Sequence, residues 1–80
     1  MTRDSNMTSI IVTAFAFEKD MSSLPKRIEY EGVIRDFTGK GACVDLMNGT
    51  IPVRFYSMTD GRNTYHLRNQ EGAWSLLRVA

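Results

Sequence analysis

The chain contains one cysteine, Cys43, and one histidine, His66, the two side chains that nucleophilic chemistry would use first. A cysteine–histidine pair needs the thiol and the imidazole within hydrogen-bond reach, and a third group that orients the ring. The strand pattern described below places the segment bearing Arg54 between them, which separates them by about 9–10 Å at ordinary strand spacing. The sequence also indicates no orienting group, so we expect no catalytic residue and no enzyme activity.

Other chemistry-bearing residues do not have the spacing of a metal or cofactor site. One histidine and one cysteine cannot supply the three or four ligands of a zinc site. Glu29 and Glu31 are two residues apart, as on the solvated face of a strand. Gly39-Lys40 lacks the glycine spacing and the following helix of a phosphate-binding loop. We therefore expect neither a metal nor a cofactor.

The charges are balanced overall but unevenly distributed. Ten Lys and Arg face nine Asp and Glu, a net charge of +1, which is not the basic excess typical of nucleic-acid-binding proteins. From residue 50 onward, however, the chain carries four arginines and no lysine, with only two acidic residues. Because arginine presents a planar set of donors, this C-terminal third favours recognition through hydrogen bonds.

The elements that position these residues are predicted to be short strands. Residues 10–17 are apolar on both faces and predict a buried central strand, with a short helix over 14–21 as the alternative. Residues 18–26 predict a connection because they include Pro25 and two serines. Alternation predicts further strands over residues 28–35 (with a bulge or bend at Gly32), 42–47, 51–56, 65–68 and 73–79, with turn residues between them.

This spacing predicts an all-β fold, a small antiparallel meander of five to six strands that forms a curled sheet or a small SH3-like or OB-like barrel. The segments Glu31-Gly32-Val33 and Val44 to Gly49 resemble the strand pattern of OB-fold proteins over about a quarter of the chain. That resemblance implies the fold alone, and no residue role is carried over. Residues 1–7 are predicted to form a disordered tail, and residues 8–80 a single β domain.

The pairing of strands determines which side chains share a face. A four-residue loop over Met47–Thr50 keeps Pro52 at a position that needs no ladder hydrogen bond, and it pairs Leu46 with Ile51. The core face of this hairpin is predicted to hold Ala42, Val44, Leu46, Ile51, Val53 and Phe55, and extending the register to the neighbouring strands adds Tyr65, Leu67 and Trp74. The same register predicts a lateral row on the wet face, consisting of Arg35, Cys43, Arg54, His66 and Ser75. The predicted binding residues on that face are Arg35, Arg54, Tyr56, His66 and Arg68.

These features favour a non-enzymatic interaction module. We expect it to bind a partner protein through the basic face or through an edge strand, or to self-associate as a homodimer. The alternatives are weak binding of single-stranded nucleic acid by the same face, to which Tyr56 alone adds an exposed ring, and small-ligand binding inside a curled sheet. The lone cysteine and the absence of a secretory signal or long apolar run predict a cytoplasmic protein of bacterial or phage type, without membrane contact.

Overall fold

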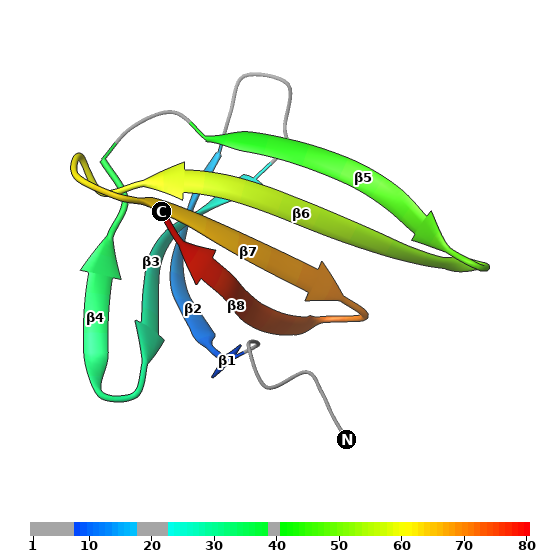
Figure 1. The fold of residues 1–80 in the computed structure, drawn as a ribbon, viewed down its shortest axis with the longest axis horizontal. Coiled ribbons are helices and arrows are strands. Elements are labelled where there is room, and N and C mark those ends of the chain that lie inside the picture. The colour runs from blue at the N-terminus through cyan, green and yellow to red at the C-terminus, as the bar shows by residue number, and fades with distance from the viewer. Residues whose placement is uncertain (1–7, 18–22, 39–40) are drawn as a thin grey trace.

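The structure is a computed structural model that describes residues 8–17, 23–38 and 41–80. In those ranges every regular element is a β-strand, which confirms the predicted all-β, antiparallel class (Figure 1). The described strands number eight and form two sheets, of orders β1-β8-β7-β6-β5 and β2-β3-β4, which do not close into a barrel. Their bounds are β1 Thr8–Ser9, β2 Ile11–Phe17, β3 Ser23–Tyr30, β4 Val33–Asp36, β5 Ala42–Asn48, β6 Ile51–Thr59, β7 Thr64–Gln70 and β8 Ala73–Val79.

The core lies between the two sheets, whose strands cross at a steep angle (Figure 1). Such crossed packing lets one face of each sheet contribute to a common core. Ile28 from β3 and Leu67 from β7 are fully buried at its centre. The core cluster consists of Ile10, Ile28, Phe37, Tyr56, Met58, Tyr65, Leu67 and Leu76. The predicted tail, residues 1–7, lies outside the described residues, and the extent of the single domain stays a prediction.

Two predictions for the N-terminal half are wrong. β2 is an edge strand of the smaller sheet, with Ile11 and Phe17 62% and 78% exposed, although its apolar run predicted a buried central strand. β3 occupies residues 23–30, so residues 23–26 of the predicted connection belong to a strand, and residues 18–22 lie outside the described residues. Phe37 donates its N–H to the carbonyl of Lys26, so the backbone of Lys26 faces β4. Pro25 comes one residue earlier, so its nitrogen faces away from β4, and its missing N–H costs no bond in the β3–β4 ladder. The alternative helix over 14–21 is excluded for residues 14–17, which belong to β2, and its remainder lies outside the described residues.

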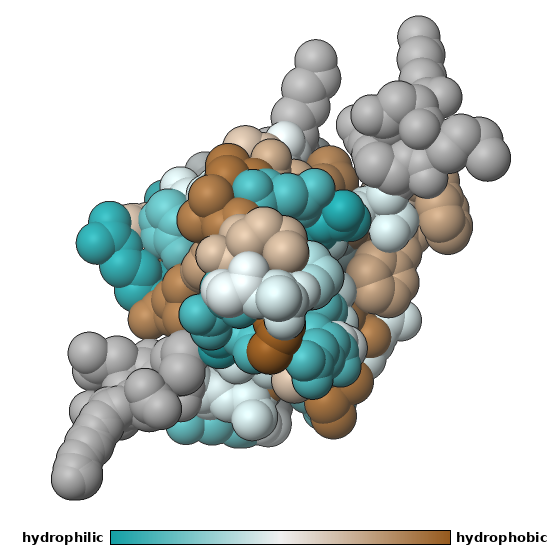
Figure 2. All heavy atoms as spheres, turned by 90° about the vertical axis from the view of Figure 1, so that its right-hand side faces the viewer, coloured by the Kyte–Doolittle hydropathy of each residue, from teal (hydrophilic) through white to brown (hydrophobic). Residues whose placement is uncertain are grey.

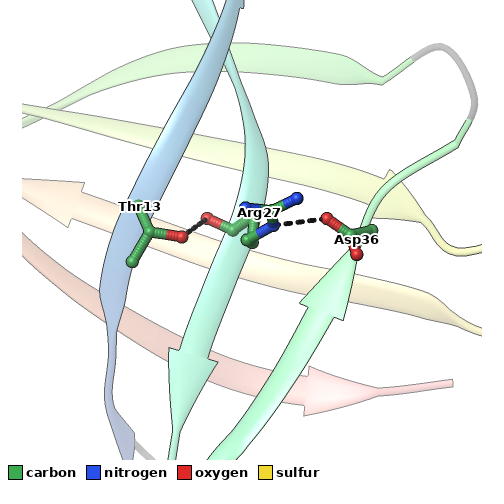
Figure 3. A network of polar contacts seen from close by, with 3 residues as sticks. All are labelled: Thr13, Arg27 and Asp36. Carbon is green, nitrogen blue, oxygen red and sulfur yellow. Dashed lines mark hydrogen bonds and ion pairs between the residues drawn. The ribbon is translucent and has the colours of Figure 1, made fainter.

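Polar contacts tie the three strands of the smaller sheet together (Figure 3). The Thr13 hydroxyl of β2 donates to the Arg27 carbonyl of β3 at 3.4 Å. The Nε–H of Arg27 donates to Oδ1 of Asp36 on β4 at 2.6 Å. Because both side chains of this ion pair are at least half exposed, we expect it to contribute less than about 1 kcal/mol.

Three hairpins have two-residue turns, and they correct the predicted loops. Glu31-Gly32 and Glu71-Gly72 have positive φ at both positions, from 50° to 83°, the pattern of a type I′ turn. The predicted strand over 28–35 is therefore a hairpin, β3–β4, that turns at the expected irregularity. The β5–β6 hairpin turns at Gly49-Thr50, with Asn48 opposite Ile51, so the predicted four-residue loop is wrong.

The position of this turn places Pro52, which has no N–H, where no ladder hydrogen bond is needed. In a two-residue hairpin the closing pair exchanges both hydrogen bonds, and bonded and non-bonded pairs then alternate along the ladder. Asn48 and Ile51 form the closing pair, so Pro52, opposite Met47, occupies a non-bonded position. The prediction that Pro52 needs such a position was sound, but the turn meets it with two residues.

Candidate functional site

The predicted basic row is not formed, because its members lie on different faces. In the five-stranded sheet we call the side that carries Tyr56 and Leu67 the inner face, since both belong to the core. Arg54, two residues from Tyr56, shares that face. His66 lies opposite Ser57, and Arg68 lies opposite Phe55, on the other side, which we call the outer face.

The cause is that the observed register between β6 and β7 differs from the predicted register. We expected His66 of β7 to lie beside Arg54 of β6. The residue of β7 opposite Arg54 is instead Asn69, three residues after His66. Since side chains alternate with a period of two, an odd shift places the side chains of β7 on the opposite face relative to β6. Arg35 lies in β4, in the other sheet, where its charge helps to lower the pKa of Asp60. Whether any of the five predicted residues binds a partner stays a prediction, but they do not form one surface.

Cys43 and His66 are separated by the same arrangement. Cys43 lies opposite Tyr56 on the inner face, whereas the Nδ1 of His66 is 3.3 Å from the Ser57 hydroxyl on the outer face. Partial removal from solvent raises the pKa of the Cys43 thiol, although the nearby Arg54 acts in the opposite direction. His66 therefore does not reach this thiol, which is less ionised at neutral pH than an ordinary cysteine.

On the inner face, four polar side chains of β5 and β6 form a connected chain. The Nε–H and Nη2–H groups of Arg54 donate to the two carboxylate oxygens of Asp45, at 2.5 and 3.2 Å. The hydrogen bonds from Arg54 to Asp45 and to Tyr56 both raise the pKa of the guanidinium. The Tyr56 side chain also forms a hydrogen bond with the side chain of Cys43. Arg54, one of the predicted binding residues, is therefore held by hydrogen bonds to its neighbours.

A groove of about 550 Å³ lies beside this chain on the inner face. Three aromatic rings from three strands line it, Phe15 of β2, Tyr56 of β6 and Trp74 of β8. Of the residues that the structure describes, the charged ones in its lining are Asp45, Arg54 and Glu71. The volume of this groove falls within the range of small-molecule binding sites.

The other feature of note is the edge strand β5 (Figure 1). Among the described strands, β5 pairs with β6 alone, and all seven of its residues are exposed. Val44 and Leu46, expected in the core, are 53% and 54% exposed on the outer face. Figure 2, which faces the end of the molecule where β5 and β6 turn, shows hydrophobic surface interleaved with hydrophilic surface.

The sequence analysis missed the Asp45–Arg54 pair and the roles of Phe15 and Trp74. A signal for the pair was present, because a turn at Gly49-Thr50 places these two opposite charges directly across the ladder, which stabilises that register. No comparable signal identified the groove, because Phe15 belongs to a different sheet from Tyr56 and Trp74.

Comparisons with known proteins found no match to the chain. It matches no family model, no curated protein and no solved structure. In the described ranges, no three residues among His, Cys, Asp and Glu are grouped closely enough to hold a metal ion. No helix in that part of the chain is long and apolar enough to span a membrane.

Proposed function

We propose that this chain is a small, non-enzymatic interaction module that acts by strand addition at β5, and that the added strand is β5 of a second copy. The observation that carries this proposal is the state of β5, which is exposed along its full length and paired on one side within the described residues. The free N–H and C=O groups of such an edge are a template for another strand.

The ladder determines which backbone groups of β5 are free. Ala42, Val44, Leu46 and Asn48 lie in the bonded pairs with β6, because these pairs alternate from the closing pair at Asn48 and Ile51. The N–H and C=O groups of Cys43, Asp45 and Met47 therefore point away from β6. An antiparallel strand can bond to all three.

A second copy fits this edge because the outer face of β5 is self-complementary. Ala42, Val44 and Leu46 form an apolar stripe there, so a two-fold pairing apposes apolar side chains from both copies. Pairing Asp45 with its own counterpart would oppose like charges. The register centred on Val44 avoids this, because it places Asp45 opposite Cys43 of the second copy and still pairs residues 41–47.

The expected dimer is weak. Pairing of one strand edge buries an area at the low end of the range for protein interfaces, below about 1,200 Å², which is typical of transient association. We therefore expect a concentration-dependent equilibrium in the micromolar to millimolar range, measurable by sedimentation equilibrium.

Substitution of Cys43 provides the test. Cys43→Pro removes a free N–H at a non-bonded edge position, where proline is tolerated, and Cys43→Ala is the matched control that keeps the N–H. We expect Cys43→Ala to associate like the natural chain, and Cys43→Pro to associate at least about tenfold more weakly, a difference of about 1.4 kcal/mol. Circular dichroism checks that both variants remain folded. Monomers at every concentration up to about 1 mM, or equal association of both variants, would refute the proposal.

Crosslinking tests the register separately. In a Cys43→Ser background, Val44→Cys places two thiols opposite each other across the two-fold axis, at a non-bonded pair where disulfides form readily. Leu46→Cys is the control, since it lies opposite Ala42 of the second copy. Faster disulfide formation in Leu46→Cys would contradict the register centred on Val44.

A further inference from the structure

The groove on the inner face has a wall of three aromatic rings. The ring centroids of Phe15 and Trp74 are 6.0 Å apart with planes inclined by 53°, and those of Tyr56 and Trp74 are 5.1 Å apart at 34°. Trp74 therefore lies between the other two, and the tilted planes form an angled wall instead of a closed parallel stack. Tyr56 is buried, Phe15 is 42% exposed, and Trp74 is intermediate, so the wall extends from the core to the solvent.

The charges around this wall are unequal in number. Arg54 is already bound to Asp45 by two hydrogen bonds, so these two charges largely cancel. Glu71, at the β7–β8 turn, adds a second carboxylate to the lining. Among the described residues, the charged ones that line the groove therefore sum to a formal charge of −1, which opposes the binding of phosphates or carboxylates and favours a cation.

We infer that this groove binds an organic cation, an alkylated ammonium group held against the rings of Phe15, Tyr56 and Trp74. The face of an aromatic ring is electronegative and attracts cations, and rings surrounding an alkylated ammonium also bury its methyl groups. A volume of about 550 Å³ is sufficient for such a group and its substituents. The same chemistry occurs in a free quaternary amine and in a methylated lysine side chain.

The net charge distinguishes this inference from nucleic-acid binding. Aromatic rings also stack on bases, but single-strand sites combine them with a positively charged groove that follows the phosphates. Here the charge of the lining has the opposite sign. The inference is also independent of strand addition at β5, because it depends on side chains of the inner face and not on the free backbone of the edge.

A pair of isosteric probes tests the inference. Trp74 is the single tryptophan of the chain, so its fluorescence reports on the groove. Choline and 3,3-dimethylbutan-1-ol have nearly the same shape, but only choline carries a charge. We expect choline to change the Trp74 emission saturably, and the neutral alcohol to bind at least tenfold more weakly. No saturable change with choline, or equal binding of the two probes, would overturn the inference.

Variants confirm the location of the site. We expect Phe15→Leu to weaken choline binding about fivefold, because it removes a ring and keeps apolar bulk, and Glu71→Gln to weaken it as well. Phe17→Leu is the matched control, since Phe17 lies on the same strand, is 78% exposed and does not line the groove. Equal weakening by Phe17→Leu would contradict the assignment.

A second titration identifies the source of the cation. The probes are choline and a short peptide that contains trimethyllysine, compared with the same peptide containing unmodified lysine. Tighter binding of choline points to a free amine, and tighter binding of the trimethylated peptide points to a modified protein. Binding of the unmodified peptide as tight as that of the trimethylated one would contradict recognition of an alkylated ammonium group.

Discussion

At the scale of single residues, Asp60 organises the connection between β6 and β7. Its Oδ1 accepts the N–H groups of Arg62 and Asn63 at 2.9 and 2.8 Å, and its Oδ2 accepts the Tyr65 hydroxyl at 3.0 Å. The backbone hydrogen bonds of Asn63 and Arg62 lower the pKa of the Asp60 carboxyl below its ordinary value of 3.8. The carboxylate form is therefore the form that the folded chain stabilises.

This shift predicts how stability depends on pH. Because the folded-state pKa is depressed, the stabilisation is complete above the unfolded value near 3.8 and is lost as the pH falls through the folded value. We expect Asp60→Asn to lower the melting temperature at pH 7 and to flatten the decline of stability below about pH 4. Thermal unfolding followed by circular dichroism at several pH values measures both effects.

The control is Asp36→Asn, the same chemical change at a carboxylate that forms a half-exposed ion pair with Arg27. We expect a smaller loss of stability at pH 7 from this variant, because exposed ion pairs contribute little. Parallel pH profiles for the natural chain and Asp60→Asn would show that the hydrogen bonds of Asp60 do not stabilise the folded state.

At the scale of elements, the strands of the C-terminal half could be predicted from the sequence, and the faces that they share could not. Alternation located the cores of β5 to β8 because a period of two is a local property of the chain. The face that is buried depends on register, and the register depends on turns. Asn48-Gly49 was the expected turn centre, but Gly49 takes the first turn position, with a φ of 67°. The observed pairing of β6 with β7 differs from the expected pairing by three residues, which is an odd number. The side chains predicted to share the wet face therefore lie on opposite faces of the sheet.

The type I′ turns make a prediction of their own. Glu31 has a φ of 50°, a left-handed conformation that costs a residue with a Cβ roughly 1–2 kcal/mol, while asparagine tolerates it better. We expect Glu31→Asn to stabilise the chain by about 0.5–1 kcal/mol, which raises the melting temperature by about 2–8 °C. Glu29→Asn is the control, because Glu29 lies within β3, where asparagine is disfavoured. A lower melting temperature for Glu31→Asn than for the natural chain would contradict the assigned turn.

At the scale of the whole molecule, the core is small and β5 contributes little to it. In the described ranges the core cluster draws on both sheets but includes no residue of β5. Chains of this length have a net stability of roughly 3–5 kcal/mol, so the loss of one core side chain is a large fraction of the total. The change in stability on substituting an apolar residue therefore shows whether that residue lies in the core or on the surface. For residues of β5, the same measurement shows whether the edge of this strand is available for a second strand.

Leu67 and Leu46 provide the decisive comparison. Leu67 is fully buried in β7, and Leu46 is 54% exposed on β5, although the alternation of the sequence predicted both in the core. We expect Leu67→Ala to cost about 2–5 kcal/mol and to unfold most of the chain, and Leu46→Ala to cost less than about 1 kcal/mol. Urea denaturation of dilute protein, followed by Trp74 fluorescence, measures both values without a contribution from association. An equal cost for the two substitutions would mean that β5 is covered in the folded chain, and the proposed strand addition would then lose its site.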